Sequence, residues 1–403
     1  MDIEKYKIKT SSVISHYILL LGFFFFLTGI LFFNSISAYH TQIYLFLIAP
    51  TLLLVLINRD WFTPILASKA FQILLLLFAY SMLSALWNDP AIEDFKHFKR
   101  FLIILLFILS LLAISRTKTD KIIILLLIAA GIYSIAAYYI FSDFDFFIQK
   151  KSVSSRLIGI GNLSNPLLSS HIYGIFTAFI MTYFLAAKRN WKKDIGLFFL
   201  FAGLLSFVLL TQSRTALVGL SAALIVSLWI HRNKYLLYFF FILCGLAIIY
   251  FILNYDSLAL RGLSYRPEIW SITLSKILDN PFFGAGIGTD ISIYIEDLKT
   301  VFSDTHNIHL GLTYNLGITG LLIWIAFLIS LFMIYLKNKT SLIAQTGIVL
   351  LAYGMSAGMT EGTGFFSRPK EVWFLTWLPI ALLFVVEYKR LITEHRNHHE
   401  ITQ

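Results

Sequence analysis

A polar run in the last third of the chain, Asp304-Thr305-His306-Asn307-Ile308-His309, carries side chains suited to acid–base chemistry. Histidine can act as a general base near neutral pH because the unperturbed pKa of its ring is about 6.5. Asp304, His306 and His309 are also conceivable zinc ligands, since zinc requires three or four donors. A histidine at a membrane edge without a chemical role fits the spacing as well. The preferred interpretation includes no metal.

Two arginines have the charge and shape to bind phosphate groups. Arg214 lies in the polar stretch Thr211-Gln212-Ser213-Arg214-Thr215 between two apolar runs, and Arg266 opens the stretch Arg266-Pro267-Glu268. A guanidinium group binds phosphate oxygens through two parallel hydrogen bonds and keeps its charge in a poorly solvated site. Contact with lipid head groups at the membrane surface is the alternative for both residues.

Alternating glycines in Phe282-Phe283-Gly284-Ala285-Gly286-Ile287-Gly288 could let a phosphate approach backbone N–H groups. No strand–helix unit is predicted around this segment, so a dinucleotide-binding fingerprint is not credible. We therefore expect a flexible loop here.

The composition of the 403-residue chain is that of a membrane protein. Apolar residues fill 58% of the positions and charged residues only 13%, whereas soluble chains carry roughly 25% charged residues. Cys244 is the only cysteine, which excludes an intrachain disulfide and a thiolate metal cluster. Basic cytoplasmic loops account for the net charge of +10, so we expect no nucleic-acid partner.

Apolar runs between polar breaks predict an all-α polytopic membrane protein with about twelve transmembrane helices, since about 20 apolar residues cross the hydrocarbon as a helix. The predicted spans are 13–33, 41–57, 68–87, 100–115, 121–141, 167–187, 195–211, 214–231, 235–254, 308–335, 341–358 and 372–388. The fourth and seventh are short and the tenth is long, so we expect tilt or a break in each. No small-residue cleavage site follows the first span, which favours a retained helix over a signal peptide.

The distribution of Lys and Arg predicts the orientation. With a cytoplasmic N-terminus, more than half of them fall inside, in short connections such as 188–193 and 231–234. Both termini are then cytoplasmic. The segments predicted to lie outside include 142–166, the long loop 255–307 between the ninth and tenth helices, 359–371 and the turn at 212–214. Charged residues are almost absent from the centres of the spans, which makes a secondary transporter the weaker interpretation.

The long outer loop contains a predicted amphipathic helix. Pro267 and Glu268 suit a first helical turn, and Asn280-Pro281 suits its end. Its predicted apolar stripe consists of Trp270, Leu274, Ile277 and Leu278. Such a helix could lie on the membrane surface or cap the helix bundle.

His306-Asn307, nine further residues and then Gly317-Ile318-Thr319-Gly320 resemble the His-(Asn/Ser/Gln)-x9-Gly signature of the O-antigen ligase family. The resemblance extends through Ser213-Arg214-Thr215, through Arg266 with Glu268 and Trp270, and through the glycine-containing loop after Asn280-Pro281. It covers residues 197–335 by motif within a single transmembrane domain, 1–403, while the N-terminal half matches only in hydropathy. The same superfamily contains O-antigen polymerases and bacterial protein O-oligosaccharyltransferases.

The resemblance implies a metal-independent, inverting glycosyltransferase with a GT-C-like fold in the bacterial inner membrane. Such ligases need no cofactor and transfer a glycan from undecaprenyl pyrophosphate to a sugar hydroxyl of lipid A–core at the periplasmic face. Arg214 and Arg266 would bind the donor pyrophosphate, and His306 would activate or orient the acceptor hydroxyl. Asn307, Glu268, Trp270 and Gly317 would support the site.

Other outer basic residues have weaker assignments. Two interpretations explain the outer basic residues equally well: contact with phosphates of the lipopolysaccharide core, or simple solvation in the loops. These residues are Lys150, Lys151, Arg156, Arg368 and Lys370. Anchoring of the fourth helix at the head groups is the expectation for Lys96, Lys99 and Arg100.

The nearest alternatives are a polymerase or a protein O-glycosyltransferase that uses the same donor with another acceptor. A lipid or solute transporter would use the arginines for an anionic head group without covalent transfer. A noncatalytic membrane scaffold is the remaining alternative, and would tolerate substitution of all three site residues.

Overall fold

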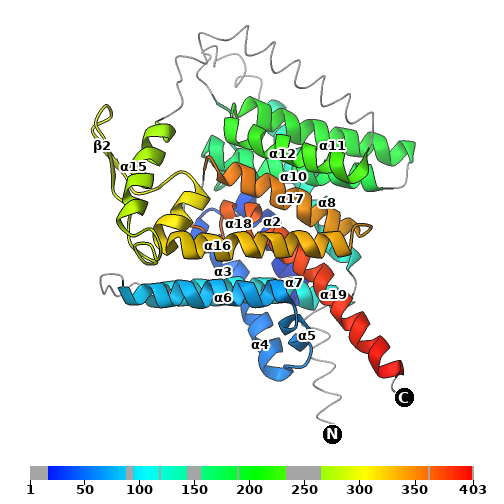
Figure 1. Ribbon diagram of the computed structural model, residues 1–403. Helices are drawn as coiled ribbons and strands as arrows, with labels where there is room; N and C mark the ends of the chain where they lie inside the picture. The colour runs from blue at the N-terminus through cyan, green and yellow to red at the C-terminus, as the bar shows by residue number, and fades with distance from the viewer. Residues whose placement is uncertain are drawn as a thin grey trace.

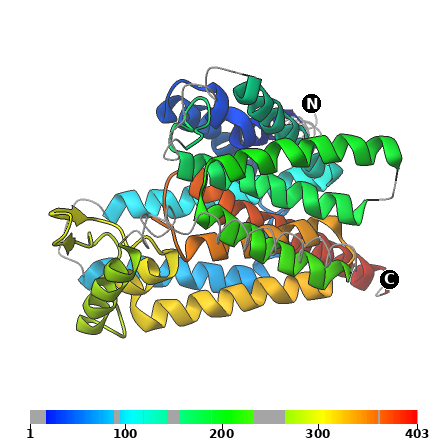
Figure 2. The same ribbon diagram turned by 90° about the horizontal axis from the view of Figure 1, so that it is seen from above.

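The computed structural model contains long helices that lie side by side, with short elements at one end and the C-terminus at the other (Figures 1 and 2). The structure describes residues 17–87, 94–117, 119–142, 156–187, 190–232, 265–361 and 364–401. The predicted ninth span, 235–254, lies outside these residues.

The first half of the chain forms α2 (Leu19–Phe32), α3 (Ile36–Ile43), a π-helical turn η2 (Tyr44–Ile48), α4 (Ala49–Ile57), α5 (Thr63–Leu66), α6 (Lys69–Leu83), a 3-10 turn η3 (Ser84–Trp87), α7 (Asp94–Thr117), α8 (Asp120–Ser142) and α10 (Pro166–Ala186). The second half forms α11 (Trp191–Leu210), α12 (Arg214–His231), α15 (Arg266–Asp279), β1 (Ile293–Ile295), β2 (Thr300–Phe302), α16 (Ile308–Lys337), α17 (Leu342–Gly358), α18 (Glu371–Leu375) and α19 (Trp377–Ile401). The two strands pair antiparallel, with Ile293 opposite Phe302.

The helices occupy the positions of the predicted spans other than 235–254. Within the described residues, nine helices are long and apolar enough to cross a membrane, and two shorter apolar helices accompany them. An all-α polytopic membrane protein is therefore confirmed. The prediction of a short fourth and seventh span was wrong: α7 has 24 residues and α11 has 20, because each continues into polar flanking residues.

Burial separates the inner helices from those that face lipid. In the apolar central part of the span formed by α18 and α19, 94% of the residues are buried, whereas the share is only 28% in α11. Figure 1 shows α19 crossing behind α16 and α17 toward the C-terminus. The outer helices present large apolar side chains such as Phe198 to their surroundings, as expected in a bilayer, where lipid is as apolar as the side chains.

Segments that the charge distribution assigned to one side of the membrane meet at one end of the bundle. The His40 ring contacts the carbonyl oxygen of Pro369 at 2.7 Å, and the Ile287 N–H donates to Ser84 Oγ. At the opposite end, Tyr388 donates to the carbonyl oxygen of Trp61. Segments predicted to lie outside thus meet at one end of the bundle, and segments predicted to lie inside meet at the other end. This arrangement is consistent with the predicted orientation of the helices.

The tenth span is broken at Gly317, as its length suggested. Gly317 has φ 63° and ψ −170°, a conformation that essentially only glycine adopts. The segment after Asn280-Pro281 pairs with the break: the N–H of Ile318 donates to the Pro281 carbonyl and the N–H of Ala285 to the Tyr314 carbonyl. The expectation of a flexible loop was therefore wrong. The N–H groups of Ala285 and Gly286 are used by α16 and are not presented to a phosphate.

Replacing Gly317 with alanine is expected to destabilise the protein. A Cβ at this position would lie 2.4 Å from the backbone of Phe282, and the backbone conformation alone costs a non-glycine residue about 1–3 kcal/mol. The melting temperature in detergent should fall clearly. Gly131→Ala is the matched control, because a Cβ at Gly131 meets nothing within 4 Å and alanine favours the helix. Equal melting temperatures for the two variants would contradict the structural role of Gly317.

Candidate active site

α15 and the β1–β2 hairpin form a small unit with its own apolar core at the end of the bundle opposite the C-terminus (Figure 1). Its buried core consists of Ile269, Ile291, Ile293 and Ile295. The predicted boundaries of the α15 helix are confirmed, but its predicted stripe was wrong in part. Ile277 is buried and Trp270 packs against the unit, whereas Leu274 and Leu278 are 51% and 74% exposed. α15 is apolar on more than one face, so periodicity could not identify the face that the hairpin covers.

The turn between β2 and α16 holds His306 in a defined position. His306 adopts a left-handed conformation, with φ 47°, and its N–H donates to Asp304 Oδ1 at 3.1 Å. Thr305 Oγ1 donates to the Asn307 carbonyl at 2.8 Å. The Asn307 side chain accepts two N–H groups of the first turn of α16, and so acts as its N-cap. The Asn307 side chain therefore fixes the turn that carries His306.

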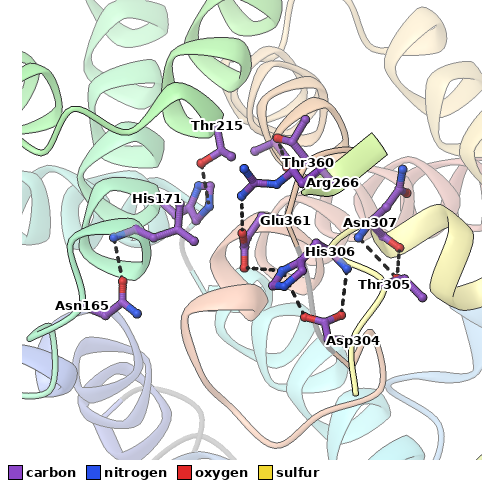
Figure 3. A network of polar contacts seen from close by, with 12 residues as sticks. Asn165, His171, Thr215, Arg266, Asp304, Thr305, His306, Asn307, Thr360 and Glu361 are labelled. Atoms are coloured by element: carbon purple, nitrogen blue, oxygen red, sulfur yellow. Dashed lines mark hydrogen bonds and ion pairs between the residues drawn. The ribbon is translucent and has the colours of Figure 1, made fainter. Parts of the chain in front are cut away.

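Glu361, which follows α17, joins two candidate site residues, Arg266 and His306, that are 40 positions apart in the sequence. Arg266 Nη2 lies 3.1 Å from Glu361 Oε2, and His306 Nδ1 lies 3.7 Å from Glu361 Oε1 (Figure 3). Asp304 Oδ2 is 3.5 Å from the same Nδ1. The contacts of the ring exceed normal hydrogen-bond length, so they are mainly electrostatic.

Glu361 was not among the residues predicted from the sequence. The available signal was a carboxylate in Thr360-Glu361-Gly362, within an outer segment between two apolar helices. A single acidic residue in a loop is common, and only the fold brings this one to His306 and Arg266.

All four charged side chains of this cluster are partly enclosed. The exposed fractions are 23% for Arg266, 27% for His306, 14% for Asp304 and 13% for Glu361. Such a site is reachable by substrate, yet its charges are less screened than those on an open surface.

The charges shift the acid–base properties of the cluster. Contact with Glu361 raises the pKa of His306 above its usual value, burial opposes this, and Asp304 adds to the increase. Burial raises the pKa of Glu361, but contact with the His306 ring outweighs it, so the net pKa is lowered. Burial raises the pKa of Asp304. The paired state of the cluster is therefore a protonated His306 beside an ionised Glu361.

Asp304, His306 and Glu361 are also close enough to hold a metal ion, with one ligand atom from each within 4.8 Å of the others. Arg266 already places a positive charge on Glu361. A bound cation would have to be accommodated beside that guanidinium group, which disfavours a divalent ion on electrostatic grounds.

His309 is not positioned as the third zinc ligand that its spacing suggested. Trp324 Nε1 donates to His309 Nδ1 at 3.3 Å, and His309 Nε2 lies 3.3 Å from the Met355 carbonyl. Both ring nitrogens thus bind within the helix bundle, because α16 turns this residue inward.

Arg214 is the first residue of α12 and is exposed. Its neighbours point inward: Ser213 Oγ lies 3.0 Å from Thr215 Oγ1, which lies 3.5 Å from Nε2 of the buried His171. Figure 3 shows Thr215 and His171 beside Arg266 and Glu361. The start of α12 therefore borders the cluster. His171 was also missed, because it lies within the apolar sixth span.

The remaining predicted residues have other contacts. Glu268 is exposed in the first turn of α15, where its charge suits the positive helix end. Arg156 Nε donates to the Thr211 carbonyl at 2.8 Å and so fixes a loop to the end of α11. Lys370 pairs with Glu371 at 3.9 Å. Lys150 and Lys151 lie outside the described residues.

The fold and the cluster define a polytopic membrane protein with a cluster of an arginine, a histidine and two carboxylates at one end of its helix bundle. A family model described as O-antigen ligase matches residues 197–325. An O-antigen ligase of Pseudomonas aeruginosa is 35% identical over 398 residues, which are 97% of this chain and 96% of that protein. The chain belongs to the O-antigen ligase family, and is thus a glycosyl-transferring membrane enzyme of lipopolysaccharide biosynthesis.

Proposed function

We propose that this protein transfers a glycan from undecaprenyl pyrophosphate to a sugar hydroxyl of lipid A–core at the periplasmic face of the inner membrane. The observation that carries the proposal is the sharing of Glu361 by Arg266 and His306. One side chain suits the phosphate of the donor and the other suits the hydroxyl of the acceptor. Their common partner holds both within reach of one reacting sugar.

The reaction is a single displacement with inversion. The acceptor oxygen forms a bond to the anomeric carbon of the donor sugar and gives its proton to the neutral His306 ring. The bond between that carbon and the phosphate oxygen breaks, and its electron pair leaves with the pyrophosphate. Arg266 stabilises the negative charge of this leaving group, and Arg214 at the start of α12 provides a second contact. These guanidinium groups supply the charge for which a metal would otherwise be needed.

Glu361 positions both groups and sets the protonation of His306. A protonated ring cannot accept the acceptor proton, so the active form is the one that has lost it. Activity should therefore rise as the pH rises through the pKa of His306.

Glu361→Gln is expected to move the rising limb of the pH profile of kcat/KM to lower pH. The Glu361 carboxylate raises the pKa of His306, so its neutralisation lowers that pKa and yields the unprotonated ring at lower pH. The maximal rate should also fall, because Arg266 loses its ionic partner. Kinetics of the purified enzyme between pH 5 and 9 (roughly the range in which histidine titrates) provide the measurement.

Glu296→Gln, an exposed change in the hairpin, is the matched control and should leave the profile unchanged. The rising limb of the pH profile could instead move to higher pH in Glu361→Gln, or stay in place. Either result would contradict the role of His306 as a base whose pKa is raised by Glu361.

The function itself is tested in a strain from which the gene has been deleted. Lipopolysaccharide gels and the pool of undecaprenyl-linked polymer are compared with and without the wild-type gene. The proposal expects bare lipid A–core and accumulated lipid-linked polymer without the gene, and a restored ladder of capped lipopolysaccharide with it. Core that carries one repeat unit would indicate a polymerase. An unchanged ladder in the deletion strain would reject the ligase assignment.

A further inference from the structure

A cavity of about 200 Å³ lies beside the turn that carries His306. Its walls come from the start of α7, the segment 287–291, the start of α16 and the segment 364–366. Asp304 and Thr305, the two residues before His306, form part of the wall. The cavity is therefore next to the proposed base.

The polar groups of the cavity are of both signs. Arg100 and His97 of α7 lie on one wall, while Asp290 and Asn315 contribute from the outer loop and α16. Arg100, predicted from the sequence as a head-group anchor, also lines this cavity. Positive and negative groups nearly balance in the cavity lining. The proposed pyrophosphate site, with its two arginines, is instead positively charged. Such a lining suits a neutral ligand with many hydroxyl groups, which donate and accept hydrogen bonds.

Asn315 gives a second indication of a ligand. Its side-chain oxygen is buried and has no hydrogen-bond partner within the described part of the chain. A buried polar atom without a partner is costly, and rotation of the amide toward the cavity would let a ligand hydroxyl satisfy it. Tyr314 and Phe366 add aromatic surface to the same cavity.

The location relative to Arg266 favours the acceptor over the donor. Figure 3 shows Arg266 beyond Glu361 as seen from His306, while Asp304 and Glu361 both approach the same ring nitrogen, Nδ1, of His306. In an inverting displacement the attacking hydroxyl and the leaving pyrophosphate occupy opposite faces of the reacting carbon. The cavity is lined by Asp304 and not by Arg266, so it lies apart from the group proposed for the leaving pyrophosphate, as a site for the attacking sugar must.

We propose that this cavity, between α7, α16 and the outer loop, is the binding site for one neutral sugar ring of the acceptor. The inference rests on the proposed ligase reaction and adds the residues that select its acceptor. A volume of about 200 Å³ is below the roughly 300–1,000 Å³ of pockets for drug-sized ligands, so it accommodates a single ring unit.

The test uses purified full-length enzyme with undecaprenyl-linked polymer as donor and lipopolysaccharide that lacks O-antigen as acceptor. Ser303→Trp fills the cavity from an exposed position, and Asp290→Asn removes a charged acceptor of hydrogen bonds. The acceptor KM should rise more than tenfold in Ser303→Trp. In Asp290→Asn it should rise about three- to tenfold, the effect of one lost hydrogen bond. The donor KM should stay within twofold in both.

Ser292→Trp and Asp297→Asn are the matched controls, because both positions are exposed in the hairpin and outside the cavity wall. They should change neither KM. All four variants are first compared with the wild type by melting temperature. An intact melting temperature shows that a kinetic change is not a folding defect.

Direct binding of the delipidated core oligosaccharide separates this inference from the proposed function. Wild-type protein should bind it, and Ser303→Trp should lose the binding. Binding without any transfer would reject the ligase reaction while the cavity assignment stands. Transfer with an unchanged acceptor KM in both variants would overturn the cavity assignment alone. An increased donor KM would assign the cavity to the donor sugar instead.

Discussion

His306→Asn is expected to lower the rate of glycan transfer by roughly 10²- to 10⁴-fold, the usual contribution of a positioned general base. Asparagine tolerates the left-handed backbone of residue 306 better than alanine does. The turn, and with it the N-cap of α16, should therefore stay intact. The loss should appear in kcat, while the KM for the lipid-linked donor changes little. Single-turnover kinetics with purified enzyme provide the measurement.

His395→Ala is the control for this substitution, since His395 is exposed at the opposite end of the bundle. It should retain full activity. His306→Ala should be at least as defective as His306→Asn, because it also strains the turn. A His306→Asn enzyme with near wild-type kcat would mean that the acceptor hydroxyl needs no base at this position.

Arg266→Ala is expected to reduce kcat/KM for the donor by roughly 10²- to 10³-fold, comparable to the loss of one group that stabilises a developing negative charge. Its guanidinium is held by Glu361 and is only partly exposed, so its interaction with pyrophosphate is poorly screened. Arg266→Lys should recover only part of the activity, because an ammonium group lacks the planar pair of donors. Arg59→Ala, exposed at the other end, is the control.

The double variant Arg266→Ala/Glu361→Gln distinguishes donor binding from a structural ion pair. If Arg266 only orients Glu361, then Glu361→Gln should weaken donor binding as much as Arg266→Ala does. If Arg266 binds the pyrophosphate, Arg266→Ala should weaken donor binding more than Glu361→Gln does, because Glu361→Gln leaves the guanidinium group present but less well positioned. Equal loss of donor affinity in both single variants and in the double variant would contradict the leaving-group role.

The sequence alone determined the membrane architecture and the residues of the short signature. Hydropathy identifies membrane helices well because every backbone polar group in lipid must be satisfied within its own helix. A run such as 308–335 therefore predicted α16 almost to the residue, and its excess length predicted the break. His306 and Arg266 stood out because charged or titratable groups are rare beside apolar runs.

Only the tertiary structure decided which groups work together. Glu361 and His171 are far from His306 in sequence, and no local pattern relates a loop carboxylate to a particular histidine. The partners of the 281–286 backbone are likewise set by the break in α16, where freed carbonyl groups accept its N–H groups. The cavity wall combines Arg100 with Asn315, which are 215 positions apart in the printed numbering. Periodicity and spacing in the sequence report local geometry. Which residues contact one another around His306 depends on how the helices pack.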